Sequence, residues 1–144
     1  KMSVQQISVF LENKCGRMAA VTKLLAQAGV NIRALSIADT SDFGILRLIV
    51  DKPDLAYQVL KEHDFTVSRT EVIAVEMPDT PGGLARVLDI LDRENINLEY
   101  LYAFLGRSGH QAINIFRVEK IDDTVRVLEK HHIQVLPEEE VYSL

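Results

Sequence analysis

Two glycine turns, each placed directly before an amphipathic stretch, are the parts of this sequence best suited to bind a ligand. Gly16 lies within Asn13-Lys-Cys-Gly-Arg-Met, and Gly82 lies within Asp79-Thr-Pro-Gly-Gly-Leu. Glycine lets a backbone approach a ligand closely. The N-terminus of a helix carries unsatisfied N–H donors and partial positive charge. A turn of this kind therefore suits a carboxylate held by backbone groups.

The two turns belong to an internal repeat. At an offset of 66 residues, Gly16 aligns with Gly82, and the alignment extends over 13–32 and 79–98. Further identical pairs at this offset are Ala19 and Ala85, Val21 and Val87, Leu25 and Leu91, and Asn31 and Asn97. The sequence therefore predicts a duplication with domains at 1–70 and 71–144. Each is small for independent stability, so we expect the units to pack on each other or on a second chain.

Apolar periodicity predicts the same order of elements in both halves. Strands of the first half are expected at 7–11, 31–38, 45–50 and 65–69, with helices at 17–28 and 53–63. Strands of the second half are expected at 72–77, 97–105, 112–118 and 133–136, with helices at 81–94 and from 122 or 123 to about 131. Thr80, and Asp122 or Asp123, are the expected caps of these two helices. The order βαββαβ predicts an α+β fold of two ferredoxin-like units packed side by side, with antiparallel sheets and helices on one face.

Two of the expected strands, 45–50 and 98–105, are apolar on both faces. A sheet that shows one face to water alternates apolar with polar residues. We therefore expect the second face, or a sheet edge, to be buried against another unit, and the chain to form a homodimer. Residues 140–144 resemble 71–75 and are expected to form a terminal strand. The glutamates at 138–140 are expected to lie in a solvated turn.

Composition narrows the classes of partner and of function. Of 144 residues 47% are hydrophobic and 26% charged, as in a soluble globular protein. The net charge of −5 disfavours nucleic acid and an anionic membrane as partners. A single cysteine fits a reducing cytoplasm, and no stretch suits a signal peptide or a membrane span. No phosphate-binding loop, nucleophile–base motif or cofactor motif is recognisable, so we expect neither an enzyme nor a cofactor.

With its turns and helices placed, the chain resembles the ACT domain family, in tandem and over nearly its whole length. The family pattern is a strand, a turn Asn/Asp-x-Pro-Gly-x-Leu, an amphipathic helix, and Gly-x-Asn-Ile at the second strand. The first copy departs from it at Cys15, where proline is usual, and the second at Asn95, where glycine is usual. The first half also resembles regulatory subunits of acetohydroxyacid synthase.

The resemblance implies that the turn of one unit and the second-strand start of its neighbour hold the carboxylate and amino groups of a ligand. Carried over to this sequence, the ligand-binding residues are Asn13, Cys15, Gly16, Met18, Asn31 and Ile32 in the first copy, and Asp79, Pro81, Gly82, Leu84, Asn97 and Leu98 in the second. The second turn is expected to be the tighter because Pro81 restricts it. Cys15 leaves the first turn less constrained.

Simpler roles remain open for these residues. The two glycines could serve only the turns, and Asn31 and Asn97 could only begin strands by bonding local backbone. Cys15 could be a reactive thiol, although a small turn residue is the simpler interpretation. The four histidines lack partners at zinc spacing, so we expect no metal. The aromatic residues of 98–105 could stack on a base, but a packed interface fits an acidic chain better.

The sequence favours a non-catalytic sensor. It would bind a free amino acid between ACT units, change their arrangement and thereby regulate amino-acid metabolism in the cytoplasm. The alternative is a regulatory subunit of a biosynthetic enzyme such as acetohydroxyacid synthase, acting mainly through contact with its catalytic partner enzyme. A small enzyme on a ferredoxin-like fold is the least favoured hypothesis.

Overall fold

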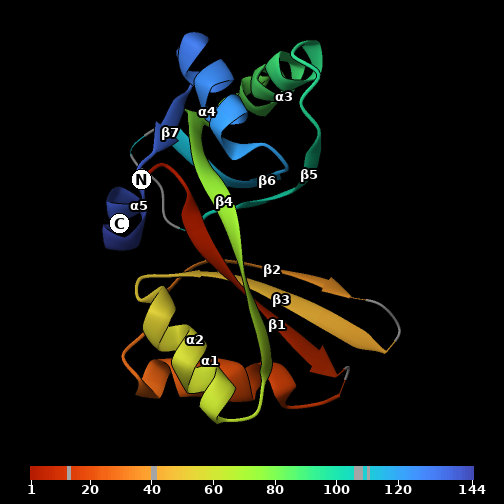
Figure 1. The fold of residues 1–144 in the computed structure, drawn as a ribbon, viewed down its shortest axis with the longest axis vertical. Helices are drawn as coiled ribbons and strands as arrows, with labels where there is room; N and C mark the ends of the chain where they lie inside the picture. Colours follow the sequence, from red (N-terminus) through yellow and green to blue (C-terminus); the bar gives the residue numbers. More distant parts are fainter. Residues whose placement is uncertain (13, 40–41, 106–108, 110) are drawn as a thin grey trace. The chain divides into compact units, whose positions relative to one another are not determined.

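The computed structural model describes residues 1–12, 14–39, 42–105, 109 and 111–144, which divide into two compact units (Figure 1). Gln5–Thr70 form one unit, called the first unit below, and Lys1–Val4 with Glu71–Leu144 form the second unit. The expected domain limits, 1–70 and 71–144, and the expected side-by-side packing of the two units stay predictions.

The first unit has the order βαββαβ, built from alternating and amphipathic stretches. Its elements are β1 (Val4–Glu12), α1 (Arg17–Gln27), β2 (Ile32–Asp39), β3 (Phe43–Val50), α2 (Pro53–Glu62) and the beginning of β4 (Thr66–Pro78). The strand order is β2-β3-β1-β4, and β3 is antiparallel to β1 and β2. One sheet face packs against α1 and α2 through a core that includes Val9, Leu25, Leu48 and Leu60.

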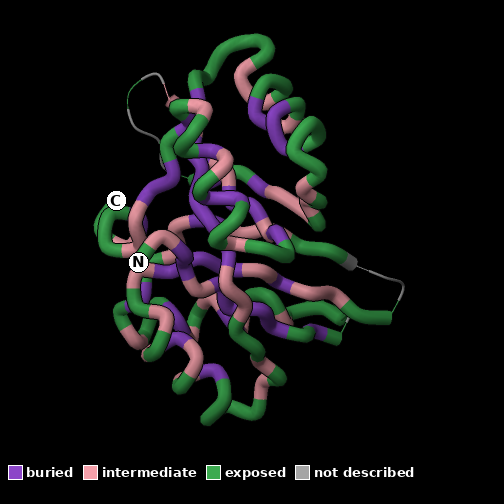
Figure 2. The backbone as a smooth tube through the Cα atoms, turned by 45° about the horizontal axis from the view of Figure 1, so that its top comes forward, coloured by how far each residue is buried: buried purple, intermediate pink, exposed green. Residues whose placement is uncertain are grey.

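The second unit repeats this topology. Its elements are the rest of β4, α3 (Gly83–Arg93), β5 (Leu98–Ala103), β6 (Gln111–Val118), α4 (Ile121–Lys130), β7 (Gln134–Leu136) and α5 (Glu138–Ser143). β4 lies between β7 and β6, β5 follows β6, and all three pairings are antiparallel. The helix-facing core includes Val75, Leu91, Phe116 and Leu128. The predicted α+β fold of two βαββαβ units is confirmed, and Figure 2 colours the buried residues along the chain purple.

The four long helices end in the same way. The second residue after each helix end, next to the C-cap, has a positive φ: Gly29 (74°), Asp64 (64°), Asn95 (57°) and His132 (61°). The next residue donates its N–H back into the last turn, as in Val30 to the Leu25 carbonyl at 2.9 Å. This is the pattern of a Schellman cap. Asn95 therefore fills the place of the family's glycine, because asparagine tolerates the left-handed region better than most residues.

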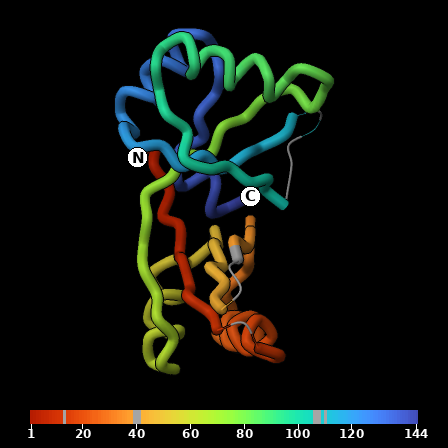
Figure 3. The backbone as a smooth tube through the Cα atoms, turned by 90° about the vertical axis from the view of Figure 1, so that its right-hand side faces the viewer, coloured from red at the N-terminus to blue at the C-terminus, as the bar shows by residue number. Residues whose placement is uncertain are grey.

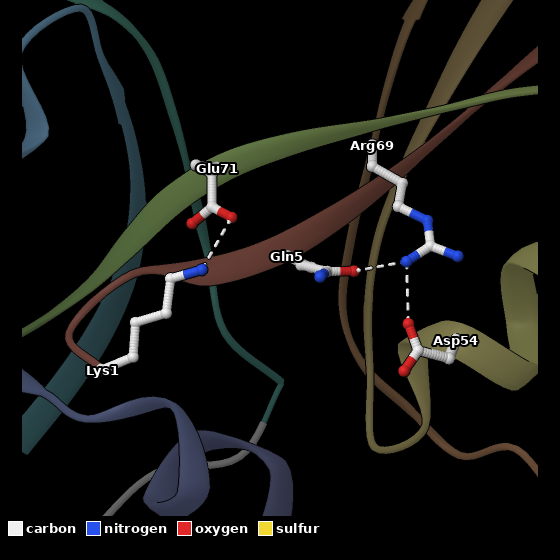
Figure 4. A network of polar contacts seen from close by, with 5 residues as sticks. All are labelled: Lys1, Gln5, Asp54, Arg69 and Glu71. Atoms are coloured by element: carbon white, nitrogen blue, oxygen red, sulfur yellow. Dashed lines mark hydrogen bonds and ion pairs between the residues drawn. The ribbon is translucent and has the colours of Figure 1, made fainter.

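The expectation of two separate strands at 65–69 and 72–77 was wrong. They form one continuous strand, β4, which Figure 3 shows as a long extended segment. Residues 66–73 contain neither glycine nor proline and are rich in Thr, Val and Ile, which favour extended backbone. Within the first unit Arg69 holds β4 to α2, because its Nη1 donates to Asp54 Oδ1 at 2.7 Å (Figure 4).

The expected helix caps were also wrong. Gly82, not Thr80, is the N-cap of α3, and Lys120, not Asp122 or Asp123, is the N-cap of α4. Neither cap residue makes a side-chain hydrogen bond to the helix. In α4 the apolar Ile121 packs against the core, which draws the helix start ahead of both aspartates. The aspartates instead lie in the first turn, where negative charge favours a helix.

The C-terminal strand expected at 140–144 is not formed. Residues 138–143 are the helix α5, which begins after the extended Pro137. A proline followed by three glutamates suits the first turn of a helix, so the glutamates belong to α5 and not to a loop. Val141 is fully buried, and the Glu138 N–H donates to the Lys1 carbonyl at 2.8 Å. The segment is therefore a docked helix.

Several residues on the sheet face turned away from the helices are buried in the second unit. Ala74 and Tyr102 both pair with Ile115 on this face, and all three are buried, as is Phe104. In the first unit Ile49 is buried, whereas Phe10 and Phe43 are 46% and 56% exposed. Burial leaves Tyr102 and Phe104 little surface for stacking on a base, so the packing interpretation holds for these two rings.

Candidate functional site

Both candidate turns are type II β-turns that lead into a helix. Gly16 has φ 87° and ψ −9°, and Gly82 has φ 86° and ψ −6°, close to the third residue of a type II turn. The closing hydrogen bond joins the Gly83 N–H to the Thr80 carbonyl at 3.0 Å in the second copy. In the first copy, the Arg17 N–H lies 3.5 Å from the Lys14 carbonyl. This agrees with the expectation that the second turn, with Pro81 at its second position, is the tighter.

Open space lies in front of the two cap glycines. A Cβ atom placed on Gly16 or Gly82 would meet no atom within 4 Å. The positive φ alone therefore explains the need for glycine there, as the simpler interpretation held. The same openness leaves room for a small ligand beside each cap glycine. The turn role and a binding role are compatible.

Gly83 must be glycine because the backbone of Pro78 lies very close to it. Sequence reasoning did not single out this residue. A Cβ atom at this position would lie 2.2 Å from the Pro78 carbonyl oxygen. The last residue of β4 and the first residue of α3 thus come together so closely that only glycine fits. The Gly-Gly pair after Pro81 was the available signal, because a type II turn needs only one of the two glycines.

The structure does not bring all predicted site residues of one copy together. In the first unit the turn lies before α1, and Asn31 and Ile32 follow the other end of that helix. Its 11 residues span about 16 Å at 1.5 Å per residue. The second unit has the same separation, because α3 stands between its turn and Asn97. Within one unit, the turn and the strand start are therefore too far apart for one free amino acid to contact both.

The predicted side chains are accessible. The exposed ones are Cys15, Met18, Asn31, Asp79, Pro81 and Asn97, and Ile32, Leu84 and Leu98 are half-buried. Asn13 lies outside the described residues. The Asn31 N–H donates to Asp51 Oδ1 at 2.8 Å, and the Asp51 N–H donates to the Asn31 carbonyl at 3.1 Å. The Asn31 backbone thus has a local structural role, through bonds that do not use its side chain.

A cavity of about 180 Å³ lies at the first turn, inside the first unit. It is lined by Leu11, Glu12, Lys14, Arg17, Met18, Ile37, Gly44 and Leu46. Glu12 accepts from Lys14 Nζ at 3.1 Å and from Arg17 Nη2 at 3.4 Å. The hydrogen bond and positive charge of Lys14, with a smaller contribution from Arg17, lower the pKa of Glu12. Sequence reasoning missed Glu12, Arg17 and Ile37, because they converge only when β1, β2 and α1 pack.

A second cavity lies in the second unit, beside Asn97 at the start of β5. It measures about 340 Å³ and is lined by Asn97 together with Asn95, Ile96, Lys120 and neighbouring residues. Among the described residues, no group of three or more His, Cys, Asp or Glu side chains is placed to hold a metal ion. None of the helices in the described ranges has the length and apolar character needed to cross a bilayer.

The duplicated βαββαβ fold, with its two turn-to-helix sites, defines a tandem ACT protein. The sequence matches the family described as ACT domain pair over residues 2–144, and the chain belongs to that family. ACT domains are typically amino-acid-binding regulatory modules and are usually not catalytic.

Solved structures include one of clearly related sequence. Protein BT0572 from Bacteroides thetaiotaomicron is 40% identical, with 99% of this chain and 98% of that chain covered and a TM-score of 0.93. The regulatory subunits of aspartate kinase from Thermus thermophilus and Thermus flavus are 16% and 13% identical, with TM-scores of 0.61 and 0.63. They cover 88% and 92% of this chain and 91% and 94% of their own, and this likeness shows the fold alone. No curated protein matches the sequence significantly.

Proposed function

We propose that this protein is a non-catalytic sensor that binds a free amino acid and regulates amino-acid metabolism in the cytoplasm. The observation that carries the proposal is the pair of type II turns with open space before a helix, in a chain of the ACT domain pair family. The backbone N–H groups of such a turn suit the ligand carboxylate, because donors and partial positive charge both face it.

Two units would share each ligand in this proposal. A turn, through Gly16 or Gly82, would hold the carboxylate, and a strand start, through Asn31 or Asn97, would contact the amino group. Because the two parts lie at opposite ends of a helix in each unit, the site needs a second unit from the same chain or from a homodimer partner. Binding then favours one arrangement of units over another, which a catalytic partner enzyme can read.

A second candidate is a regulatory subunit whose main activity is contact with a biosynthetic enzyme, such as acetohydroxyacid synthase or an aspartate kinase. Phe10 and Phe43, exposed by 46% and 56% on the first unit, favour a protein contact there. Capture of a catalytic subunit in the absence of amino acids would support this candidate. A requirement for added amino acid would support the sensor.

The test of the sensor is a thermal-shift screen against the common amino acids. A ligand at about 100 times its dissociation constant adds about 2.7 kcal/mol of stability, which corresponds to a rise in Tm of about 5–10 °C. Calorimetry then compares wild type with Gly16→Val and Gly82→Val, since valine is strained at positive φ. Asp79→Asn should have a milder effect than Gly82→Val.

Ala85→Val, at an exposed position within α3, is the control for a general effect of the larger side chain. Circular dichroism checks that each variant folds. We expect at least one glycine variant to lose binding. Unchanged affinity in both folded variants would contradict the assignment of the turns, and the absence of any shift in the screen would contradict the sensor.

A further inference from the structure

The two copies of the turn carry different side chains at matching positions. Strand register sets the match, because Leu11 pairs with Gly44 as Met77 pairs with Ala112. Each charged residue of the first copy has an uncharged counterpart in the second: Glu12 matches Pro78, Lys14 matches Thr80, and Arg17 matches Gly83. The two copies therefore cannot bind a ligand in the same way.

The charges of the first copy leave an excess of one positive charge beside the cavity. Glu12 lies between Lys14 and Arg17, at 3.1 Å and 3.4 Å. The Arg17 guanidinium also lies 5.7 Å from the centre of the Phe65 ring. Its Nε is shielded from solvent and has no hydrogen-bond acceptor among the described residues. A ligand carboxylate would supply the missing negative charge.

The other wall of the cavity is aliphatic. Leu11, Met18, Ile37 and Leu46 line it, and Met18 and Ile37 are 41% and 44% exposed. Ile37 pairs with Leu46 across β2 and β3, so both side chains lie on the helix-facing side of the sheet. The matching pair in the second unit is Ala103 and Asn114, and Asn114 Nδ2 there lies 3.6 Å from Met77 Sδ. The aliphatic wall is therefore a property of the first copy.

We infer that the cavity at the first turn makes this protein selective for amino acids with a small aliphatic side chain. The inference rests on the proposed function and adds the class of ligand. The ligand carboxylate lies at the turn beside Arg17 and Lys14, and the ligand side chain contacts Met18, Ile37 and Leu46. The volume of about 180 Å³ lies below the roughly 300–1,000 Å³ of typical ligand pockets, which suits a ligand of leucine size.

The test is calorimetry on the full chain with L-leucine, L-alanine and L-aspartate. Leucine has three more carbons than alanine to bury, so it should bind about 50-fold more tightly. L-aspartate should bind more weakly than either, because its second carboxylate would face the aliphatic wall. Ile37→Ser removes part of that wall at a half-exposed position and should weaken leucine about 10-fold and alanine much less, because alanine has only a methyl group to place against the wall.

Two control variants separate this inference from a general effect. Ala103→Ser makes the matching change in the second unit and should leave both affinities unchanged. Arg17→Met should weaken all amino acids at this site by at least about 10-fold, whereas Lys23→Met, on an exposed part of α1, should not. If amino acids bind but leucine and alanine bind equally, or if Ile37→Ser has no effect, the inference fails and the proposed function stands. If no amino acid binds the wild-type protein, both fail.

Discussion

For the replacement of Gly83 by alanine, helix propensity and a tertiary contact predict opposite effects on stability. Gly83 is the first residue of α3, and alanine is favoured over glycine in helices by about 1 kcal/mol. Helix propensity alone therefore predicts that Gly83→Ala stabilises the protein. In the structure, however, the new Cβ would lie 2.2 Å from the Pro78 carbonyl oxygen. The obstacle is backbone at the end of β4, which cannot rotate away as a flexible side chain could.

The magnitude follows from the size of the overlap. Relief of the contact requires a backbone shift, and overpacking of this kind costs about 1–3 kcal/mol. After subtraction of a helix gain that is partial at the first helical position, we expect a net loss of about 2 kcal/mol. With a urea m-value of about 2 kcal/mol per M, the midpoint should fall by about 1 M.

The assay is urea unfolding followed by circular dichroism, with Lys23→Ala as the control variant. Lys23 lies at an exposed position of α1 and already carries a Cβ atom, so its change should shift the midpoint little. A midpoint for Gly83→Ala equal to or above that of wild type would refute the reasoning. It would mean that the turn from Pro78 to Gly83 relaxes without cost.

Two further predictions concern a helix end and an ion pair. In urea unfolding, Asn95→Ala should lower the free energy of unfolding by about 1 kcal/mol, because Asn95 has φ 57°. Asn95→Gly should be nearly neutral. Equal effects of the two changes would contradict a role for backbone conformation. An NMR titration should place the pKa of Glu12 below its ordinary value, and Lys14→Met should move it back up. A folded-state pKa below the unfolded one means that this stabilisation is present above the unfolded pKa and is lost as the pH falls through the folded one. An unshifted pKa in wild type would contradict the Lys14 contact.

The two turns of this ACT domain pair differ in their side chains, so they suit different parts of an amino acid. The second turn, with Pro81 and two glycines, has no charge where the first copy has Glu12, Lys14 and Arg17, and its one charged residue is Asp79. It therefore suits the carboxylate and ammonium groups that all amino acids share. The first turn adds charge and an aliphatic wall, so it suits one class of side chain. If both sites fill, the first would set which amino acid is sensed.

The sequence by itself determined the duplication, the order of elements and the class of fold. It did so because these depend on short-range patterns. The helices follow apolar stripes, and the first ends at Gly29, whose φ of 74° a glycine adopts without strain. Two copies of the same pattern in one chain reinforced the assignment. The turn glycines were also predictable, because a residue with positive φ before a helix has few alternatives to glycine.

Only the tertiary structure decided which residues share a site. The requirement for glycine at 83 comes from the Pro78 carbonyl, and the first-turn cavity joins Glu12, Arg17 and Ile37 from three different elements. C-terminal residues that resemble the start of a strand formed α5, because Pro137 and the glutamates after it favour a helical turn over pairing. Contacts of this kind depend on strand register and helix packing, which bring together residues that no short-range pattern relates.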